Sequence, residues 1–192
     1  MKKFLIILAI IVGVVLLWGW STYNGLVNKQ EAMTKAWGQV ENVYQRRADL
    51  VPNLVAVVKS YAEYEQGTLV AVTEARAKAA KATVNMENFD EAEFANFEAA
   101  QKELDNTLSR LLVAVESYPD LKASENYLAL QAQLEGCENR IQTERERFNE
   151  AAKAYNQSVR RFPSNLLAKL FGFEKRPYFQ ATEGAEKAPE TF

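Results

Sequence analysis

Apolar residues recur along this chain at intervals of three and four, the spacing of a helix that buries one face. One ladder covers residues 33–75, a second covers 94–118 and a third covers 127–162. Alternation with a period of two, which would indicate strands, is absent from the sequence. The pattern therefore predicts an all-α protein whose apolar stripes close into an antiparallel four-helix bundle.

Prolines and one polar run set the expected ends of these helices. Pro52, Pro119 and Pro163 each follow a strongly helical stretch, and the residue before a proline tends to leave the helical region. The polar run that ends at Asp90 is the expected loop, and Asp90 with Glu93 resembles a capping box that starts the next helix. We expect helices near 21–49, 52–82, 91–118 and 123–162.

Two features of the pattern leave alternatives open. The apolar ladder keeps its phase across Pro52, so that one long kinked helix competes with a turn at this proline. A helix over residues 123–162 would be about 60 Å long, whereas the three helices before it would reach about 40–46 Å. The last helix therefore either overhangs the others or breaks near Gly136.

The first twenty residues are the most apolar part of the chain. Two lysines are followed by seventeen residues, 4–20, that are apolar or glycine. A helix there would span about 25 Å, slightly less than a hydrocarbon core of about 30 Å. Trp18, Trp20 and Tyr23 cluster at its far end, where an aromatic belt at the membrane interface is expected. The segment is thus predicted to cross a membrane.

A cleaved signal peptide is the alternative to a lasting anchor. It would have a shorter apolar region and small residues at its cleavage site, whereas Trp20 and Tyr23 are bulky. We therefore predict an uncleaved signal-anchor over residues 1–22. The basic N-terminus favours a cytoplasmic start, with the bundle on the non-cytoplasmic side, although Lys29 and Lys35 weaken this bias.

A second apolar segment lies near the end of the chain, with basic residues after it. It contains Leu166, Leu170, Phe171 and Phe173. This segment can form a short helix that caps the bundle, or it can lie on the membrane surface as an interfacial segment. The predicted bundle domain covers residues 23–180, and residues 181–192 are expected to be a disordered tail.

Composition narrows the classes of function. Of 192 residues, 48% are apolar and 25% are charged, as in ordinary globular proteins. The chain has 23 basic and 25 acidic residues, and only two lysines precede residue 21. The predicted bundle is therefore mildly acidic, and we expect no nucleic-acid partner because phosphate backbones attract basic surfaces.

The sequence offers no set of catalytic or metal-binding residues. It contains no histidine, which is the commonest general base and metal ligand. Its single cysteine, Cys137, falls on an apolar stripe, as a small core residue does. We therefore predict no enzyme activity, no metal site and no cofactor.

Arg47 is the one charged residue on its part of the apolar ladder, where a lone charge would carry a heavy desolvation cost. We expect a structural ion pair at the bundle end far from the membrane. The candidate partners are Glu125, Asp120 and Glu116, in that order, because a turn at the nearby proline would bring them to the same level. The alternative is a binding surface formed by Arg46 and Arg47.

Several motifs follow one another in a fixed order between residues 23 and 179. They are Tyr23-Asn24-Gly25-Leu26-Val27, Ala36-Trp37-Gly38-Gln39-Val40, Arg46-Arg47-Ala48-Asp49-Leu50-Val51-Pro52-Asn53-Leu54-Val55, Ser117-Tyr118-Pro119-Asp120-Leu121-Lys122, Glu138-Asn139-Arg140-Ile141, Phe148-Asn149 with Tyr155-Asn156, Arg161-Phe162-Pro163 and Phe171-Gly172-Phe173. In these motifs the chain resembles the LemA family of bacterial membrane proteins. The resemblance implies a single-pass protein of the inner membrane with a helical bundle, working beside other envelope proteins such as membrane metallopeptidases. It supplies no activity.

Two functions fit these expectations. The first is a membrane-anchored scaffold or adaptor of the bacterial envelope, whose partners are the lipid bilayer and another envelope protein or a second copy. The second is a carrier that holds a lipid or a hydrophobic peptide within the bundle. An apolar cavity of a few hundred Å³ would favour the carrier.

Overall fold

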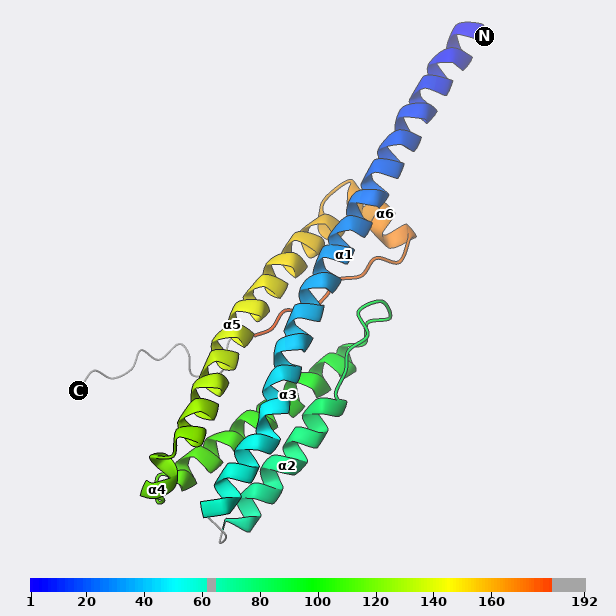
Figure 1. The fold of residues 1–192 in the computed structure, drawn as a ribbon. Helices are drawn as coiled ribbons and strands as arrows, with labels where there is room; N and C mark the ends of the chain where they lie inside the picture. The colour runs from blue at the N-terminus through cyan, green and yellow to red at the C-terminus, as the bar shows by residue number, and fades with distance from the viewer. Residues whose placement is uncertain (62–64, 181–192) are drawn as a thin grey trace, which may run out of the picture. The chain divides into compact units, whose positions relative to one another are not determined.

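The structure is a computed structural model that describes residues 1–61 and 65–180, and this part of the chain forms six helices (Figure 1). They are α1 (Lys2–Tyr61), α2 (Gln66–Lys81), α3 (Glu91–Val115), α4 (Pro119–Lys122), α5 (Glu125–Arg160) and α6 (Ser164–Leu170). The described residues contain no strand, and the predicted all-α class is confirmed. The predicted disordered tail, 181–192, lies outside the described residues.

The chain divides into two compact units. Met1–Ala36 and Arg145–Phe192 form the first, which we call the anchor unit, and Trp37–Glu144 form the second, which we call the bundle unit. Helices α1 and α5 each contribute one part to either unit.

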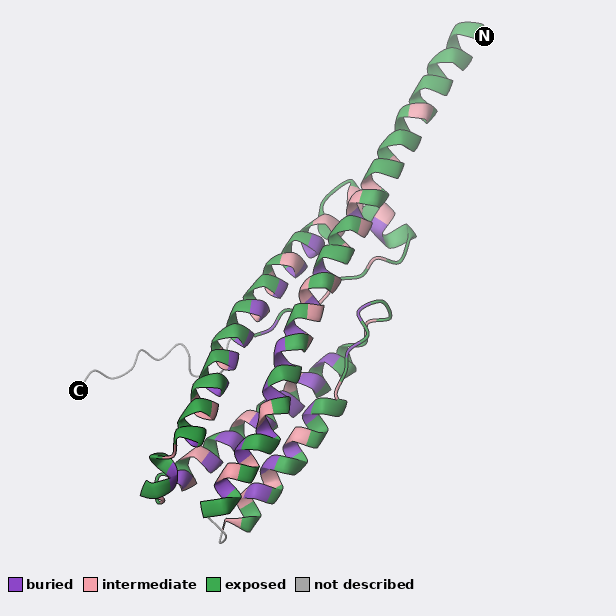
Figure 2. Cartoon of the chain, viewed as in Figure 1, coloured by how far each residue is buried: buried purple, intermediate pink, exposed green. Residues whose placement is uncertain are grey.

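Four helical segments surround the core of the bundle unit, namely the second part of α1, then α2, α3 and the first part of α5 (Figure 2). Short connections join consecutive segments, so that their directions alternate as the predicted antiparallel bundle requires. The core residues are Val51, Leu54, Val58, Leu69, Val72, Ala75, Ala79, Leu104, Leu108, Leu111, Val115, Leu121, Tyr127 and Leu134. Burial of each large apolar side chain of this kind stabilises the folded state by about 1.5–3 kcal/mol.

Helix α1 runs through Pro52, and the expected helix end before this proline is wrong. A proline inside a helix lacks the N–H that would bond to the carbonyl four residues earlier, here Ala48. In the structure Arg76 of α2 supplies the missing donor, since its Nε lies 2.9 Å from the Ala48 carbonyl oxygen. Val51 and Leu54, on either side of the proline, are fully buried. Core packing and a donor from another helix therefore offset the local cost of the proline.

Helix α5 is also continuous, because it passes Gly136 without a break. It spans residues 125–160, slightly shorter than the predicted range of 123–162. Its first part belongs to the bundle unit and its second part to the anchor unit. The part of α5 that was predicted to overhang the other helices therefore belongs to the anchor unit.

The predicted start of α3 is correct, and half of its capping box is present. Asp90 is the N-cap, and its carboxylate accepts a hydrogen bond from the Ala92 N–H at 2.8 Å. Glu93 bonds instead to the backbone N–H of Asn85, at 3.3 Å. Its carboxylate therefore ties the preceding loop to the first turn of the helix.

An aromatic cluster fills one level of the bundle unit. The ring of Trp37 lies 5.1 Å from that of Phe97 and 5.7 Å from that of Phe94. Tyr44 contacts Phe97 edge to face at 5.2 Å. Burial raises the pKa of the neighbouring Glu41 carboxyl, while a hydrogen bond with the Trp37 side chain lowers it. The contacts join α1 to α3 over more than one helical turn.

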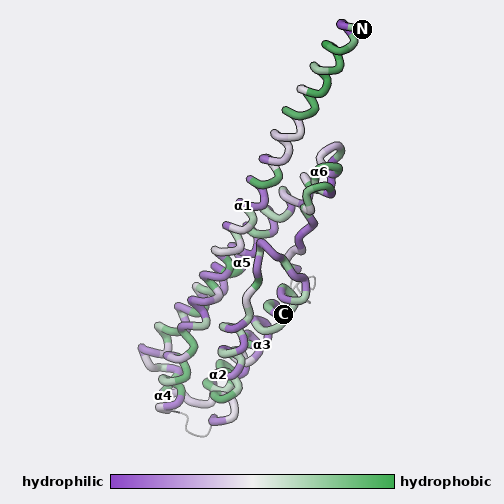
Figure 3. Tube along the Cα trace, turned by 90° about the vertical axis from the view of Figure 1, so that its right-hand side faces the viewer, coloured by the Kyte–Doolittle hydropathy of each residue, from purple (hydrophilic) through white to green (hydrophobic). Residues whose placement is uncertain are grey.

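The first part of α1 is apolar and exposed along its length (Figures 2 and 3). It contains an eighteen-residue window with a mean hydropathy of 2.6, none of which is buried inside the protein. In water such a surface would be costly, at roughly 25 cal/mol for each Å². This helix is therefore long and apolar enough to cross a membrane, as predicted.

The role of Arg76 can be tested by a double-mutant cycle with Pro52. Arg76→Ala should lower the free energy of unfolding by about 1–3 kcal/mol, because it leaves the Ala48 carbonyl without its donor. In a Pro52→Ala background the backbone N–H at position 52 takes over, and the same change should cost under about 0.5 kcal/mol. Urea unfolding of the full chain in detergent micelles, followed by far-ultraviolet dichroism, measures both values.

Lys78→Ala is the matched control on the same helix. Lys78 is exposed and pairs with Glu103 at 2.7 Å, so its loss should cost under about 1 kcal/mol in both backgrounds. Equal costs of Arg76→Ala in both backgrounds would show that Arg76 does not compensate for the proline.

Candidate functional site

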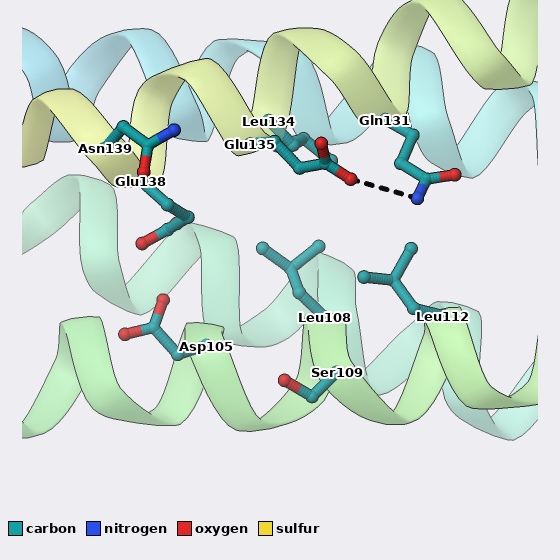
Figure 4. A pocket seen from close by; sticks show the side chains of 9 residues that line it. All are labelled: Asp105, Leu108, Ser109, Leu112, Gln131, Leu134, Glu135, Glu138 and Asn139. Atoms are coloured by element: carbon teal, nitrogen blue, oxygen red, sulfur yellow. Dashed lines mark hydrogen bonds between the residues drawn. The ribbon is translucent and has the colours of Figure 1, made fainter. Parts of the chain in front are cut away.

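The bundle unit carries an open groove of about 540 Å³ between α3 and the first part of α5 (Figure 4). Nine residues line it, namely Asp105, Leu108, Ser109, Leu112, Gln131, Leu134, Glu135, Glu138 and Asn139. Its volume falls in the range of about 300–1,000 Å³ that is usual for ligand sites. Among the features of the described residues, this groove is the best candidate for a functional site.

The lining of the groove combines apolar and acidic side chains. Leu108 and Leu112 of α3 face Leu134 of α5 and supply the apolar surface (Figure 4). Asp105, Glu135 and Glu138 add three carboxylates. Glu135 also accepts a hydrogen bond from Gln131 at 3.1 Å, one turn earlier on the same helix.

Arg47 lies beneath this groove and is completely buried. Its Nη1 donates hydrogen bonds to Asp105 and, at 2.9 Å, to Glu138, while its Nη2 donates to the Gln101 side-chain oxygen at 2.8 Å. The guanidinium carbon also lies 5.0 Å from the centre of the Tyr44 ring. One arginine of α1 therefore holds two groove carboxylates, one from α3 and one from α5.

The carboxylate partners of Arg47 differ from those predicted. None of Glu125, Asp120 and Glu116 is among its ion pairs, and Glu116 instead pairs with Lys122. The prediction assumed a turn at Pro52, which would place Arg47 at the end of the bundle. Because α1 continues to Tyr61, Arg47 lies fourteen residues, or about 21 Å, before the helix end.

The sequence contained one overlooked sign of the correct level. Gln101 is a polar residue on the apolar stripe of α3, just as Arg47 is on that of α1. Two polar residues on stripes that face the same core are expected to meet, because each needs a partner there. Pairing them would have led to Asp105, one turn further along α3.

The polar groups of the groove are three carboxylates, two amides and one hydroxyl. No cluster of histidine, cysteine and carboxylate side chains suited to a metal ion occurs within residues 1–61 and 65–180. Cys137 is buried. The groove's acids can bind a partner through charge, and its leucines can bind one through apolar contact.

The predicted membrane-interface residues lie in the anchor unit. Trp20 is 69% exposed, and Trp18 and Tyr23 are both 37% exposed. The Tyr23 ring contacts the rings of Phe171 and Phe173 edge to face, at 4.9 and 5.7 Å. The structure thus brings two parts of the sequence together that were predicted separately, the aromatic end of the anchor and the segment after α6.

The apolar side chains of α6 are largely uncovered. Leu166, Leu170 and Phe171 are 62%, 74% and 54% exposed, whereas Ala168 is buried. Gly172, at φ +74°, lies just beyond the end of α6, and the Phe173 N–H after it donates to the Ala168 carbonyl at 2.8 Å. Exposed leucines beside an aromatic belt are typical of segments that lie on a membrane surface.

The coupling between the two groove carboxylates can be measured. Asp105→Ala or Glu138→Ala should each lower the free energy of unfolding by about 1 kcal/mol or less, because the other acid still neutralises Arg47. Together they leave a buried unpaired charge and should cost about 3–5 kcal/mol, a coupling of at least about 1 kcal/mol. Chemical unfolding of the full chain gives all three values.

Arg46→Ala serves as a control, since Arg46 is exposed next to Arg47 and should cost under about 0.5 kcal/mol. Strictly additive costs of the two acidic substitutions would contradict a shared role in neutralising Arg47.

Comparison with known proteins identifies the family of this chain. The model of the LemA family matches residues 36–191. Relatives include the magnetosome protein MamQ of Magnetospirillum gryphiswaldense, 27% identical over 82% of this chain and 64% of that protein. Magnetosome protein MamQ 2 of Paramagnetospirillum magneticum is 40% identical over 39% of this chain and 28% of that protein.

Another relative is Protein LemA of Metamycoplasma hominis, 25% identical over 83% of this chain and 69% of that protein. This chain thus spans less than two thirds of the MamQ proteins that it matches. The match to the family model begins within α1 and covers the whole bundle unit, the rest of α5, α6 and the segment that follows. Since most of its length fits that one family model, this chain belongs to the LemA family.

Proposed function

We propose that this protein is a membrane-anchored adaptor of the bacterial envelope, without catalytic activity of its own, whose groove docks a helix of another envelope protein. Its apolar helix and its membership of the LemA family both indicate a membrane-associated protein. The observation that carries the proposal is the groove between α3 and α5, with leucines and carboxylates on one surface.

The chemistry of the groove favours a helix with an apolar stripe flanked by lysine or arginine. Such a stripe would pack on Leu112 and on the small exposed parts of Leu108 and Leu134, and the basic flanks would meet the three carboxylates. With Arg47 included, the local formal charge is −2, so that the groove attracts cations. Because Arg47 holds Asp105 and Glu138 in place, little side-chain entropy is lost when a partner binds.

A carrier of lipid or hydrophobic peptide is the second candidate, and the leucines of the groove are the observation in its favour. Three carboxylates at the same site oppose it for anionic lipids, since like charges repel the headgroup. The groove is also open to solvent, whereas a carried lipid needs most of its surface covered.

For the anchor, we propose that residues 1–22 span the inner membrane without cleavage, with the bundle unit on the non-cytoplasmic side. The two N-terminal lysines support a cytoplasmic start. Trp18, Trp20 and Tyr23 would lie at the opposite interface, and α6 would rest on the membrane there through Leu166 and Leu170. The ring contacts of Tyr23 with the segment after α6 support this common level.

Site-directed photo-crosslinking tests the docking groove. A benzophenone amino acid at Ser109, on the rim of the groove, should crosslink in intact cells to an envelope protein. The crosslinked peptide should be helical, with basic residues beside an apolar stripe. Glu135→Arg should reduce the yield at least about tenfold, because charge reversal repels basic flanks.

Two controls match this experiment. The same crosslinker at Val113, exposed on α3 outside the groove, should not give the product. Glu146→Arg, the same charge change at an exposed position of α5, should leave the yield unchanged. A crosslink from Ser109 to phospholipid would favour the carrier and contradict the adaptor.

Membrane fractionation and depth measurements test the anchor. The protein should stay in the membrane pellet after carbonate and high-salt extraction, because its apolar helix has no cover within the protein. A spin label at Leu170 should be shielded from a water-soluble relaxant, whereas a label at Val113 should not. Purification of a mature form that begins near Ser21 would contradict the uncleaved anchor, and a fully accessible label at Leu170 would contradict the interfacial role of α6.

A further inference from the structure

Two aromatic–asparagine pairs, Phe148-Asn149 and Tyr155-Asn156, stand seven residues apart on α5 in the anchor unit. Both aromatic side chains are completely buried. Seven residues are close to two helical turns, so the two asparagines lie on the same face of the helix. The docking groove of the bundle unit involves neither pair.

Each asparagine bonds to both backbone groups, N–H and C=O, of one residue in an extended segment, residues 174–180, which we call the strap. Asn149 accepts a hydrogen bond from the Phe179 N–H and donates one to the Phe179 carbonyl, both at 2.9 Å. Asn156 does the same with Arg176, at 2.9 and 2.8 Å. Seven helical residues rise about 10.5 Å and three extended residues about 10 Å, so the two spacings match.

This asparagine clamp recognises the main chain of the strap. All four hydrogen bonds go to backbone N–H and C=O groups, which every residue except proline offers. One side chain adds selectivity, because Phe179 is buried and its ring lies 5.5 Å from that of Phe148. The guanidinium of Arg145 lies 4.7 Å from the centre of the Phe179 ring and donates to the Gln180 carbonyl at 2.8 Å.

The strap leaves one polar group of this site unsatisfied. Tyr155 is fully buried, and its hydroxyl has no hydrogen-bond partner among the described residues. Burial raises the pKa of this hydroxyl, while the nearby charge of Arg176 lowers it and that of Glu174 raises it. Both of these charged residues belong to the strap. An unpaired buried hydroxyl destabilises the protein, so a different segment that bonded to it would fit better.

We propose that the asparagine clamp is a binding site for an extended peptide of another protein, and that the strap occupies this site in cis as a competitor. The ligand is an extended segment with an aromatic residue at the Phe179 position and a hydrogen-bonding side chain that reaches Tyr155. A strap from a second copy would leave the hydroxyl unpaired, as the cis strap does, and this is why the ligand is assigned to a different sequence.

Binding of a synthetic peptide in trans is the first test. The probe is a fluorescein-labelled peptide with the strap sequence Glu-Lys-Arg-Pro-Tyr-Phe-Gln, added to the full chain in nonionic detergent. Fluorescence anisotropy should show binding to the Phe179→Ala protein at least about tenfold tighter than to the unaltered protein, whose own strap competes at a high effective concentration. A probe with alanine in place of its phenylalanine should bind at least about tenfold more weakly.

The clamp itself is tested in the Phe179→Ala background. Asn149→Asp keeps the shape but replaces the donor with a carboxylate, so probe affinity should fall at least about tenfold. Asn126→Asp, the same change at an exposed asparagine of α5 outside the docking groove, should leave probe affinity unchanged. Equal affinities for the two variants would overturn the clamp.

A measurement on the unaltered protein guards against misfolding of the variants. Excess unlabelled probe should accelerate hydrogen exchange at the Arg176 and Phe179 amides, which donate to the asparagines, while α5 stays protected. If the probe neither accelerates this exchange nor binds in the anisotropy measurement, the proposal is overturned.

Tyr155 decides between a foreign ligand and a second copy. Among probes with asparagine in place of lysine or arginine, at least one should bind more tightly than the parent probe, and Tyr155→Phe should abolish that gain. Should no probe gain affinity, while differently tagged copies of the chain co-purify through their straps, the ligand is a second copy and the assignment to another protein is overturned.

Discussion

The bundle unit depends on how it neutralises one buried guanidinium. Arg47 of α1 donates to Asp105 and Gln101 of α3 and to Glu138 of α5. Gln101 in turn donates to the Ala79 carbonyl of α2, at 3.3 Å. All four helical segments therefore meet in one hydrogen-bonded network. Because a buried charge without acceptors is far more costly than a mispacked methyl group, the network fixes which levels of the four helices face each other.

The same network shapes the outer surface of the unit. Asp105 and Glu138 are about half exposed, so each contacts Arg47 on one side and the groove on the other. A rigid pair of carboxylates beside leucines is suited to recognition, since binding then costs less side-chain entropy. The structural role of Arg47 is thus compatible with a binding role for the two carboxylates that it holds.

The two units offer two kinds of recognition. The groove of the bundle unit presents side chains, and it is suited to a folded helix with its own apolar face. The asparagine clamp of the anchor unit presents paired amide groups, and it binds extended backbone. The proposed adaptor would hold one partner through a helix in the groove and another through an extended segment in the clamp.

Sequence periodicity determined the helical class, the start of α3 at its Asp90 cap and the apolar anchor, because each of these follows from neighbours within a few residues. The family also followed from ordered local motifs. The passage of α1 through Pro52 did not follow, since the donor that completes the Ala48 carbonyl comes from Arg76, 28 residues further along the chain. The partners of Arg47 were missed for the same reason: the continuation of α1 sets its level in the bundle. Whether a helix continues past a local breaker, and which charges then face each other, is decided by contacts between distant segments, and these exist only in the tertiary structure.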